Sequence, residues 1–375
     1  MTTRIYNTSV GSIVPLEVGS HVKMYTCGIT PYDAAHLGHA AVYLTFDILQ
    51  RRLRDQGVTT QCVRNVTDVD DDILRKAREL NCHYLDLAAS EMAKFDRDMN
   101  ALGLIPASSE PRATSAISEI LTMVDSLMRS GHAYLSDGYV YFDVTTSSGL
   151  GAIGHYSMDE MLTFAAERGG NPSDKRKRHP LDFVLWQPSL DDEPAWDSLW
   201  GPGRPGWHIE CSALVRRELG DTIDIHGGGS DLIFPHHECE AMQSEAVTGL
   251  PFSRYWMHVG MVRLDGVKMS KSLGNLVFVG DLVEKWDPSV VRLAIVRHHY
   301  RSSWDWRDSD LSEAQELLDR WRRAGAGDAA LTEARAALDD DLNVATAVEA
   351  IDSEARRGRG VSSAAELLGL SMVAS

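Results

Sequence analysis

The sequence predicts an α/β protein whose core is a parallel, doubly wound sheet, divided by an inserted α/β segment and followed by a C-terminal helical bundle. Three observations support this prediction. A strand, a loop, a helix and a second strand follow one another within residues 22–66. Strand-like runs return after residue 180, and apolar residues at helical spacing continue from residue 275 to the end.

The first unit has the pattern of a βαβ motif. Residues 22–26 and 59–66 are rich in β-forming residues, and apolar residues recur at helical spacing in residues 40–53 between them. Ligands in doubly wound sheets bind at the carboxyl ends of the strands. We therefore expect a binding site where these two strands end.

The segment that follows reads as an insertion. Residues 73–131 have a helical pattern, with an apolar stripe near its end, and residues 133–144 alternate as in a hairpin. The polar, locally basic stretch at residues 167–180 predicts a surface loop. Strand-like runs at residues 183–186, 222–226 and 256–262 are expected to restore the parallel sheet. The stripe consists of Ile117, Ile120, Leu121, Val124 and Leu127.

The C-terminal bundle is predicted from two apolar helical faces and from a break at residues 358–363. We divide the chain into a first half of the core at residues 1–95, an inserted connective segment at 96–180, a second half of the core at 181–285 and the bundle at 286–375. The two faces consist of Leu311, Ala314, Leu317, Leu318 and Trp321, and of Ala334, Leu338 and Leu342.

Composition limits the class of protein. The 375 residues are 43% hydrophobic, enough for a sizeable core, with neither a signal-peptide pattern nor a run of eighteen apolar residues. Five scattered cysteines argue against a disulfide framework and leave thiol or metal chemistry open. We expect a cytoplasmic monomer without a membrane partner. The formal net charge of −17 also disfavours a nucleic-acid partner unless basic residues are locally concentrated.

The run His36-Leu-Gly-His39 follows a strand and a loop and opens a helix. Imidazoles at the positive end of a helix can donate hydrogen bonds to phosphate oxygens during a phosphoryl or nucleotidyl transfer. Gly38 lets a ligand approach the backbone closely. Capping or surface histidines are the alternative interpretation of such a short motif. We take His36 and His39 as candidate catalytic residues.

A second motif, Lys268-Met-Ser-Lys-Ser272, lies far downstream. Two lysines among flexible neighbours can close on a triphosphate and neutralise a departing pyrophosphate, although a solvated basic turn has the same composition. The two motifs, in this order on a split α/β core, resemble the signatures of class I aminoacyl-tRNA synthetases. The resemblance implies a Rossmann-type core, ATP as a substrate with magnesium, an aminoacyl-adenylate, and catalytic roles for Lys268 and Lys271.

Three candidate metal ligands are Cys27, Cys211 and His236. Thiolates and imidazoles suit zinc, but these residues are far apart in the sequence, so their spacing alone does not indicate a metal site. Their contexts, TCGIT, GWHIEC and FPHHECE, resemble the zinc site of cysteinyl-tRNA synthetases and their relatives. The resemblance implies one zinc ion per chain that binds the thiolate of substrate cysteine, with Glu240 as a possible fourth ligand. Zinc binding to the thiolate would separate cysteine from serine without editing.

The resemblance covers most of residues 22–301 and also implies substrate contacts, including an ion pair between Asp231 and the ammonium group of cysteine. Glycine turns and a core role for Trp207 are the alternatives. We expect Cys239 to have a structural role, and we assign no role to His237. The residues implied to bind cysteine or the adenylate are Gly28, Ile29, Thr30, Val42, Asn65, Val66, Thr67, Trp207, Gly229, Ser230, Asp231 and Val262.

Two related families share this machinery and differ in the acceptor. The synthetases charge tRNA, whereas the cysteine ligases of mycothiol biosynthesis use glucosaminyl-inositol. The run GITPYDAAHLGHA, with His39 in place of the synthetases' asparagine, resembles the ligases, as does ERGGNP at residues 167–172. Three positions differ from the usual sequence of the ligases. Glu240 matches the synthetases instead, Val42 stands where the ligases tend to have threonine, and Asn171 stands where their ERGGDP motif has aspartate.

The C-terminal sequence also helps to distinguish between tRNA and the amino sugar as the acceptor. The chain stops at Ser375, soon after its helical bundle, and reading an anticodon normally requires a further basic and aromatic surface. We therefore expect cysteine activation with ATP and transfer to the amine of 1D-myo-inositol 2-amino-2-deoxy-alpha-D-glucopyranoside, with the loop at residues 167–180 helping to cover the site. A cysteine–tRNA ligase, complete or truncated, and a non-catalytic cysteine or adenylate sensor are the alternatives.

Overall fold

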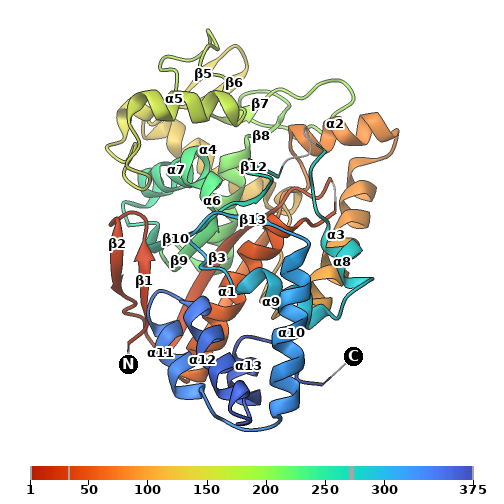
Figure 1. Ribbon diagram of the computed structural model, residues 1–375. Helices are drawn as coiled ribbons and strands as arrows, with labels where there is room; N and C mark the ends of the chain where they lie inside the picture. Colours follow the sequence, from red (N-terminus) through yellow and green to blue (C-terminus); the bar gives the residue numbers. More distant parts are fainter. Residues whose placement is uncertain (1, 33, 270–273, 374–375) are drawn as a thin grey trace.

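A parallel sheet of four strands lies at the centre of the molecule (Figure 1). The computed structural model describes residues 2–32, 34–269 and 274–373. The strands lie in the order β10-β9-β3-β4, and all three neighbouring pairs are parallel. Their bounds are β3 (His21–Ile29), β4 (Thr59–Val66), β9 (Ile223–Gly229) and β10 (Ser253–Val259).

Helix α1 (Leu37–Asp55) connects β3 to β4, which confirms the predicted βαβ unit. The helix begins where the His36 side chain accepts a hydrogen bond from the Gly38 amide. The central residues of β3 are almost all buried, as is typical of parallel strands covered on both faces. The α/β fold class predicted from the sequence is therefore confirmed.

A second, antiparallel sheet has the order β5-β6-β7-β8. The predicted hairpin is confirmed as β5 (Ala133–Ser136) and β6 (Tyr139–Phe142). The expectation that residues 183–186 return to the parallel sheet is wrong, because β7 (Phe183–Gln187) pairs with β6 and with β8 (Arg204–Pro205). A short apolar run predicts a buried strand but does not indicate its partner.

A third sheet has the order β12-β11-β13. The run predicted as one strand at residues 256–262 is divided, because β10 ends at Val259 and β11 (Val262–Leu264) pairs with β12 (Val267–Lys268) and β13 (Trp304–Trp306). Strand β13 lies in a region predicted to be helical. The N-terminal hairpin of β1 (Arg4–Asn7) and β2 (Ser12–Pro15) was not predicted from the sequence either.

The helices outside the first unit form three groups. Those between β4 and β7 are α2 (Asp71–Leu80), α3 (Tyr84–Ala101), α4 (Ile117–Arg129) and α5 (Met158–Glu167), with 3₁₀ turns at Ala113–Ala116 and Val144–Thr146. Those beside β9 are α6 (Trp207–Leu219) and α7 (Glu238–Thr248). The C-terminal group is α8 (Val279–Val283), α9 (Pro288–Val296), α10 (Ser309–Ala324), α11 (Leu331–Asp339), α12 (Val344–Arg356) and α13 (Ser362–Leu367). None of the described helices is both long and apolar enough to span a membrane.

The parallel sheet and the C-terminal helices share one apolar core, which runs from Met24 of β3 through α1 to Trp321 of α10. The residues of the two predicted faces are buried, except for Leu317, which is half-buried. Leu342 is buried but does not belong to the second helix, because α11 ends at Asp339 and Leu342 lies beyond it with φ of 47°. A buried ion pair between Asp47 of α1 and Arg292 of α9 crosses this core. Arg292 also donates to the carbonyl of Leu368 at 2.8 Å, so α1 and both ends of the bundle are held together.

The first and last parts of the chain also meet. The Thr3 hydroxyl donates to Asp339 Oδ1 at 2.8 Å, and the Tyr6 amide donates to Asp341 Oδ1 at 2.7 Å. The Arg52 guanidinium of α1 binds the same Asp339 carboxylate at 2.8 Å. These contacts fasten the N-terminal hairpin to the C-terminal helices.

Candidate active site

The carboxyl ends of β3 and β4 form the floor of the candidate site. The Gly28 amide donates to Asn65 Oδ1 at 2.7 Å, and Asn65 Nδ2 donates to Thr67 Oγ1 at 3.0 Å. A Cβ atom at residue 28 would lie 1.6 Å from the Asn65 carbonyl oxygen, so this approach of the two strands requires glycine. The structure therefore brings together three of the predicted substrate residues.

The two candidate catalytic histidines lie at the N-terminus of α1. His36 is the N-cap residue, and its Nδ1 accepts a hydrogen bond from the Gly38 amide at 3.0 Å. The ring of His39 stacks on that of His36 with 3.9 Å between the centroids. No acidic residue lies in the first turn of α1, and the Leu37 amide donates to the Val277 carbonyl at 3.0 Å. An anion beside the two imidazoles would lie at the positive end of the helix dipole.

The four candidate metal ligands come from four different parts of the fold. Cys27 lies near the end of β3, Cys211 lies in α6, His236 lies in the irregular segment Ile233–His237, and Glu240 lies in the first turn of α7. Their ligand atoms all lie within 4.8 Å of one another, and all four residues are buried. His236 Nε2 lies 2.9 Å from Glu240 Oε1. The set named from the sequence thus forms one compact cluster.

The electrostatics of the cluster suit a cation. Burial raises the pKa of Glu240, but the imidazoles of His226 and His236 outweigh it and lower the pKa to about 2. Burial raises the pKa of the Cys27 thiol, whereas the hydrogen bond from Cys27 lowers that of Cys211 to about 6. Anionic groups this deeply buried are costly unless a positive charge compensates them. Two sulfurs, one imidazole and one carboxylate are ligands that zinc accepts in a tetrahedral site.

A shell of histidines surrounds this cluster. Cys27 Sγ lies 3.3 Å from His237 Nε2, and His226 Nε2 lies 2.9 Å from Glu240 Oε2. Because His226 and His237 also lie within 4.8 Å of Cys27 and Glu240, they form a second possible group of four metal ligands. Burial lowers the pKa of His237 well below its usual value, so this imidazole is neutral.

Sequence reasoning gave no role to His237 or His226. The available signal was the concentration of histidines around the candidate ligands, in the runs DIHGGG and FPHHEC. The runs do not show which imidazoles turn toward the metal ligands. The shell continues to His258, whose Nε2 lies 2.8 Å from His237 Nδ1 and whose Nδ1 lies 2.7 Å from the Thr8 hydroxyl.

The remaining predicted residues lie around this floor. The Trp207 ring stacks on that of His236 with 4.2 Å between the centroids, and it is half-buried at the start of α6. The Lys268 ammonium of β12 lies 3.0 Å from Asp231 Oδ2, which brings the second motif to the end of β9. Lys271 lies outside the described residues.

The smaller predicted residues occupy strand ends and the helix beside them. Val42 of α1 faces Gly229, because a Cβ atom at residue 229 would lie 3.9 Å from Val42 Cγ2. Val262 is buried but belongs to the third sheet, where it pairs with Trp304. The others follow directly from the bounds of the strands: Ile29 and Val66 end β3 and β4, Thr30 follows β3, and Ser230 follows β9.

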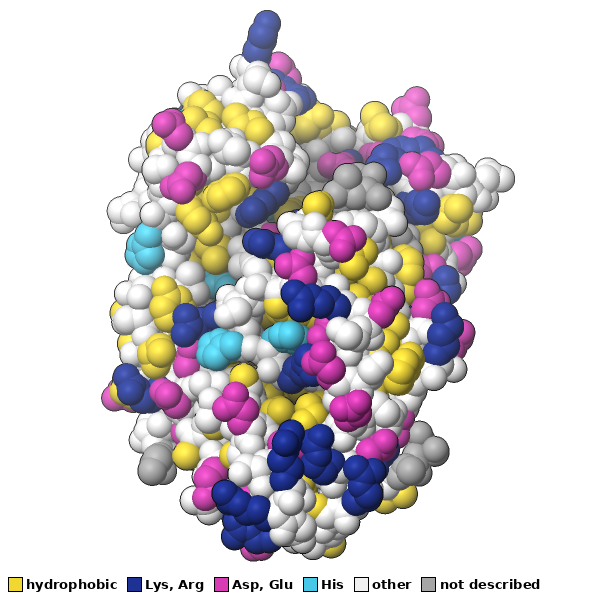
Figure 2. Space-filling view, in the orientation of Figure 1, with side chains coloured by type: hydrophobic (Ala, Val, Ile, Leu, Met, Phe, Trp, Pro, Cys, Tyr) yellow, Lys and Arg dark blue, Asp and Glu magenta, His cyan; other side chains and the backbone are white. Residues whose placement is uncertain are grey.

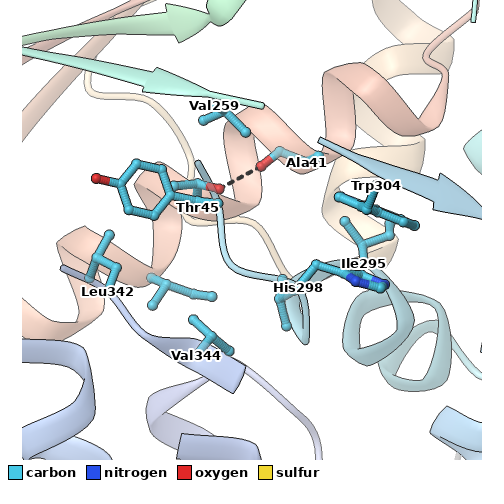
Figure 3. A pocket seen from close by; sticks show the side chains of 11 residues that line it. Ala41, Thr45, Val259, Ile295, His298, Trp304, Leu342 and Val344 are labelled. Carbon is cyan, nitrogen blue, oxygen red and sulfur yellow. Dashed lines mark hydrogen bonds between the residues drawn. The ribbon is translucent and has the colours of Figure 1, made fainter. Parts of the chain in front are cut away.

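A small pocket lies away from this floor, between α1, the end of β10 and the C-terminal helices (Figure 3). The Trp304 and His298 rings stack at its side with 3.8 Å between their centroids. Its lining contains none of the predicted site residues, so we do not assign it to the substrates. The lining residues are Ala41, Thr45, Ile48, Val259, Ile295, Val296, His298, Tyr300, Trp304, Leu342 and Val344.

Comparison with protein families gives one match over most of the chain. Residues 13–316 match the family described as tRNA synthetases class I (C) catalytic domain. A protein of Kribbella flavida is 45% identical over 98% of this chain and 93% of its own length. A protein of Thermobifida fusca is 46% identical over 93% of this chain and 86% of its own length. Both relatives are named L-cysteine:1D-myo-inositol 2-amino-2-deoxy-alpha-D-glucopyranoside ligase.

Solved structures of other synthetases share the fold at low sequence identity. The Mycobacterium tuberculosis methionyl-tRNA synthetase, bound by methionyl-adenylate, has a TM-score of 0.65 and 16% identity, and the match covers 90% of this chain and 83% of that one. The leucyl-tRNA synthetase of Agrobacterium radiobacter has a TM-score of 0.64 and 11% identity, with 95% and 83% covered. These likenesses confirm the fold of the catalytic core.

Proposed function

Because the chain belongs to the family of L-cysteine:1D-myo-inositol 2-amino-2-deoxy-alpha-D-glucopyranoside ligases, within the class I (C) tRNA synthetases, we propose that it catalyses the reaction for which these relatives are named. It activates L-cysteine with ATP and joins the cysteinyl group to the amine of the amino sugar, a step of mycothiol biosynthesis. The observation that carries the proposal is the buried cluster of Cys27, Cys211, His236 and Glu240 beside the strand ends that bind substrate.

In the first step, a carboxylate oxygen of cysteine attacks the α-phosphorus of ATP. The new P–O bond gives cysteinyl-AMP, and the bond to the β-phosphate oxygen breaks to release pyrophosphate. His36 and His39 donate hydrogen bonds to the phosphates at the N-terminus of α1, where their stacked rings already lie. Lys268 and Lys271 neutralise the departing pyrophosphate. Magnesium accompanies ATP, as is usual for nucleotide substrates.

The second step forms the amide. The unprotonated amine nitrogen of the sugar attacks the carbonyl carbon of the adenylate, and the carbon–oxygen bond to AMP then breaks. The nitrogen loses one proton, and AMP leaves as the second product. No covalent enzyme intermediate is needed, because the adenylate itself is the activated acyl group.

Zinc is the metal that the cluster would hold, one ion per chain, through Cys27, Cys211, His236 and Glu240. When bound, it would supply a Lewis acid for the thiolate of substrate cysteine. The protein residues place the rest of the substrate around that thiolate. Gly28, Thr30, Asn65 and Thr67 line the strand ends, and Trp207 covers the cluster through its contact with His236. Ile29, Val42, Val66, Gly229, Ser230 and Val262 complete the binding surface.

An amino-sugar acceptor fits the molecule better than tRNA. On the face in Figure 2, Lys and Arg side chains are intermixed with Asp and Glu over the upper and middle parts, and several Lys and Arg side chains gather at the lower part. The formal net charge of −17 disfavours a polyanion such as tRNA. We propose a cytoplasmic monomer that binds only small-molecule substrates, with no nucleic-acid partner.

A side-by-side assay with both acceptors tests this function. With cysteine and ATP present, the enzyme should form the amide with glucosaminyl-inositol and should leave cysteine tRNA uncharged. Cysteine-dependent exchange of pyrophosphate into ATP should occur without either acceptor, and serine should replace cysteine very poorly. Robust tRNA charging without amide formation would instead establish the cysteine–tRNA ligase. The absence of exchange would favour a non-catalytic sensor.

A further inference from the structure

Arg168 connects the inserted segment to the candidate active site. It is the residue directly after α5, in the stretch predicted to be a surface loop. Its neighbours Glu167 and Gly169 are exposed, but Arg168 itself is half-buried. Its guanidinium carbon lies 4.6 Å from the centroid of the Phe164 ring, so the side chain is held along α5.

The Arg168 guanidinium binds two backbone carbonyls on the other side. Nη1 donates to the carbonyl oxygen of Asp231 at 2.5 Å and also to that of Phe234. Both residues lie in the short segment between β9 and α7, where a 3₁₀ turn at Ser230–Leu232 gives way to extended backbone at Phe234, with φ of −133°. Charge-assisted hydrogen bonds to two carbonyls fix a segment that lacks the regular bonding of a helix.

The segment between β9 and α7 carries two side chains that are proposed to contact different parts of the cysteinyl-adenylate. The Asp231 carboxylate, paired with Lys268, lies at the end that binds the amino group and the nucleotide. Two residues after Phe234, His236 lies in the metal cluster, at the end that binds the thiolate. The spacing of these two side chains therefore depends on the backbone that Arg168 holds.

A second contact ties the insertion to the same region. The Glu238 carboxylate, at the start of α7, accepts hydrogen bonds from the amides of Ile153 and Gly154, both at 2.8 Å. The insertion thus contacts this part of the site at two points. Of the two contacts, only that of Arg168 comes from the loop at residues 167–180.

We propose that Arg168 is a positioning residue for adenylate formation, which sets the distance between Asp231 and His236 and couples the loop at residues 167–180 to the site. The inference rests on the proposed function and deepens it. Both bonds come from Nη1, whose two N–H groups lie in the plane of the guanidinium, a fixed geometry that a rotating ammonium group does not have. A shift of about 1 Å in a substrate-positioning group can cost on the order of 100-fold in rate.

The experiment compares Arg168→Met and Arg168→Lys with Arg176→Met in the full-length chain. Arg176 lies in the same loop, but it pairs with Asp174 at 2.7 Å and lies over the Tyr139 ring, both within the insertion. For Arg168→Met, we expect kcat of cysteine-dependent pyrophosphate exchange to fall about 10- to 100-fold, with KM for ATP within about threefold. Arg168→Lys should recover only a small part of the loss, and Arg176→Met should stay within about twofold of the parent.

A second readout does not need activity. Hydrogen–deuterium exchange of the peptide amides at residues 230–240 should quicken about tenfold in Arg168→Met and stay unchanged in Arg176→Met, because Arg168 bonds to the carbonyls of this segment whereas Arg176 contacts Asp174 and Tyr139 within the insertion. Unchanged amide exchange, or an equal effect of both substitutions, overturns the inference.

If the parent chain shows no pyrophosphate exchange, the proposed function fails while the amide measurement still decides the role of Arg168. Addition of methylguanidinium should partly restore kcat to an Arg168→Ala variant, and full activity of Arg168→Lys would contradict a requirement for the guanidinium.

Discussion

Cys211 and Cys82 carry the same thiol group in opposite surroundings. Cys211 is buried beside Cys27, His236 and Glu240, whereas Cys82 is exposed after α2. A thiol binds a metal strongly only where further ligands converge on it, and each ligand of a compact set contributes to the affinity.

We therefore predict that the purified protein carries about one zinc ion per chain and that Cys211→Ala loses most of it during dialysis against a weak chelator. Cys82→Ala should retain the metal. Metal analysis by mass spectrometry measures both. Full zinc content in Cys211→Ala would show that the second group, which includes His226 and His237, holds the ion without it.

The sequence indicates which residues belong to the metal cluster better than it indicates how these residues are arranged in space. The contexts of Cys27, Cys211 and His236 indicated the metal cluster only through their resemblance to a family, because the parts of the fold that carry them meet only in three dimensions. The same limit explains why His226 and Arg168 were not singled out. Their partners are a carboxylate and backbone carbonyls that lie 14 to 66 residues away.

The short strand β12 presents Lys268 to the end of β9. Its contact with Asp231 joins two residues that the resemblance assigns to different parts of the substrate. A lysine that neutralises the leaving pyrophosphate stabilises the transition state more than the bound substrates.

For Lys268→Ala, we expect kcat of pyrophosphate exchange to fall by about 100-fold or more and KM for cysteine to change less than about threefold. Lys76→Ala is the matched control, since Lys76 is a helix lysine whose partner, Glu79, is exposed. Steady-state exchange kinetics of both variants provide the measurement. Equal kcat values for the parent and Lys268→Ala would make the motif a surface turn.

Helix α2 begins at Asp70, whose carboxylate accepts hydrogen bonds from the Ile73 amide and the Thr30 hydroxyl, both at 2.9 Å. Burial raises the pKa of Asp70 to about 6 despite these two bonds. Because the folded chain holds this proton more tightly than the unfolded chain, the stabilisation is present below pH 4 and is lost as the pH rises to about 6.

Asp70→Asn should therefore flatten the pH dependence of stability between about pH 4 and pH 6, by up to about 3 kcal/mol. Urea unfolding across this range measures the difference between the variant and the parent. Glu79→Gln, at an exposed position of the same helix, should leave the curve unchanged. An unaltered pH dependence in Asp70→Asn would mean that another group controls this range.

The helices and strands could largely be predicted from the sequence, but the pairing of the strands could be predicted only in part. The βαβ unit and the hairpin at β5 and β6 follow from local periodicity, which the chain obeys there. Strand β7 joins the antiparallel sheet and β13 interrupts a helical region, because strand pairing depends on distant residues that a local pattern does not contain. β13 has only three residues, too few to show a period.

At the scale of the whole molecule, the ion pair of Asp47 and Arg292 holds the sheet-packing helix to the bundle inside one core. Neither side chain is exposed to solvent. Removing one member of such a pair leaves a buried charge without compensation.

Asp47→Ala should lower the free energy of unfolding by about 3–5 kcal/mol, because the charge of Arg292 is then buried without the Asp47 carboxylate that compensates it. The exposed Asp72 gives a control, and Asp72→Ala should cost less than about 1 kcal/mol. Urea denaturation followed by circular dichroism compares the two variants. A small effect of Asp47→Ala would indicate that the carbonyls around Arg292 suffice to hold its charge.

The contacts of Thr3 with Asp339 and of Tyr6 with Asp341 set an order for biosynthesis. These partners are 336 and 335 residues apart, so strand β1 can complete its contacts only after the residues that separate them have been made. At about 5–20 residues per second, translation imposes a wait of roughly 20–70 s on this strand. The hairpin of β1 and β2 therefore reaches its final contacts long after its own residues have been synthesised.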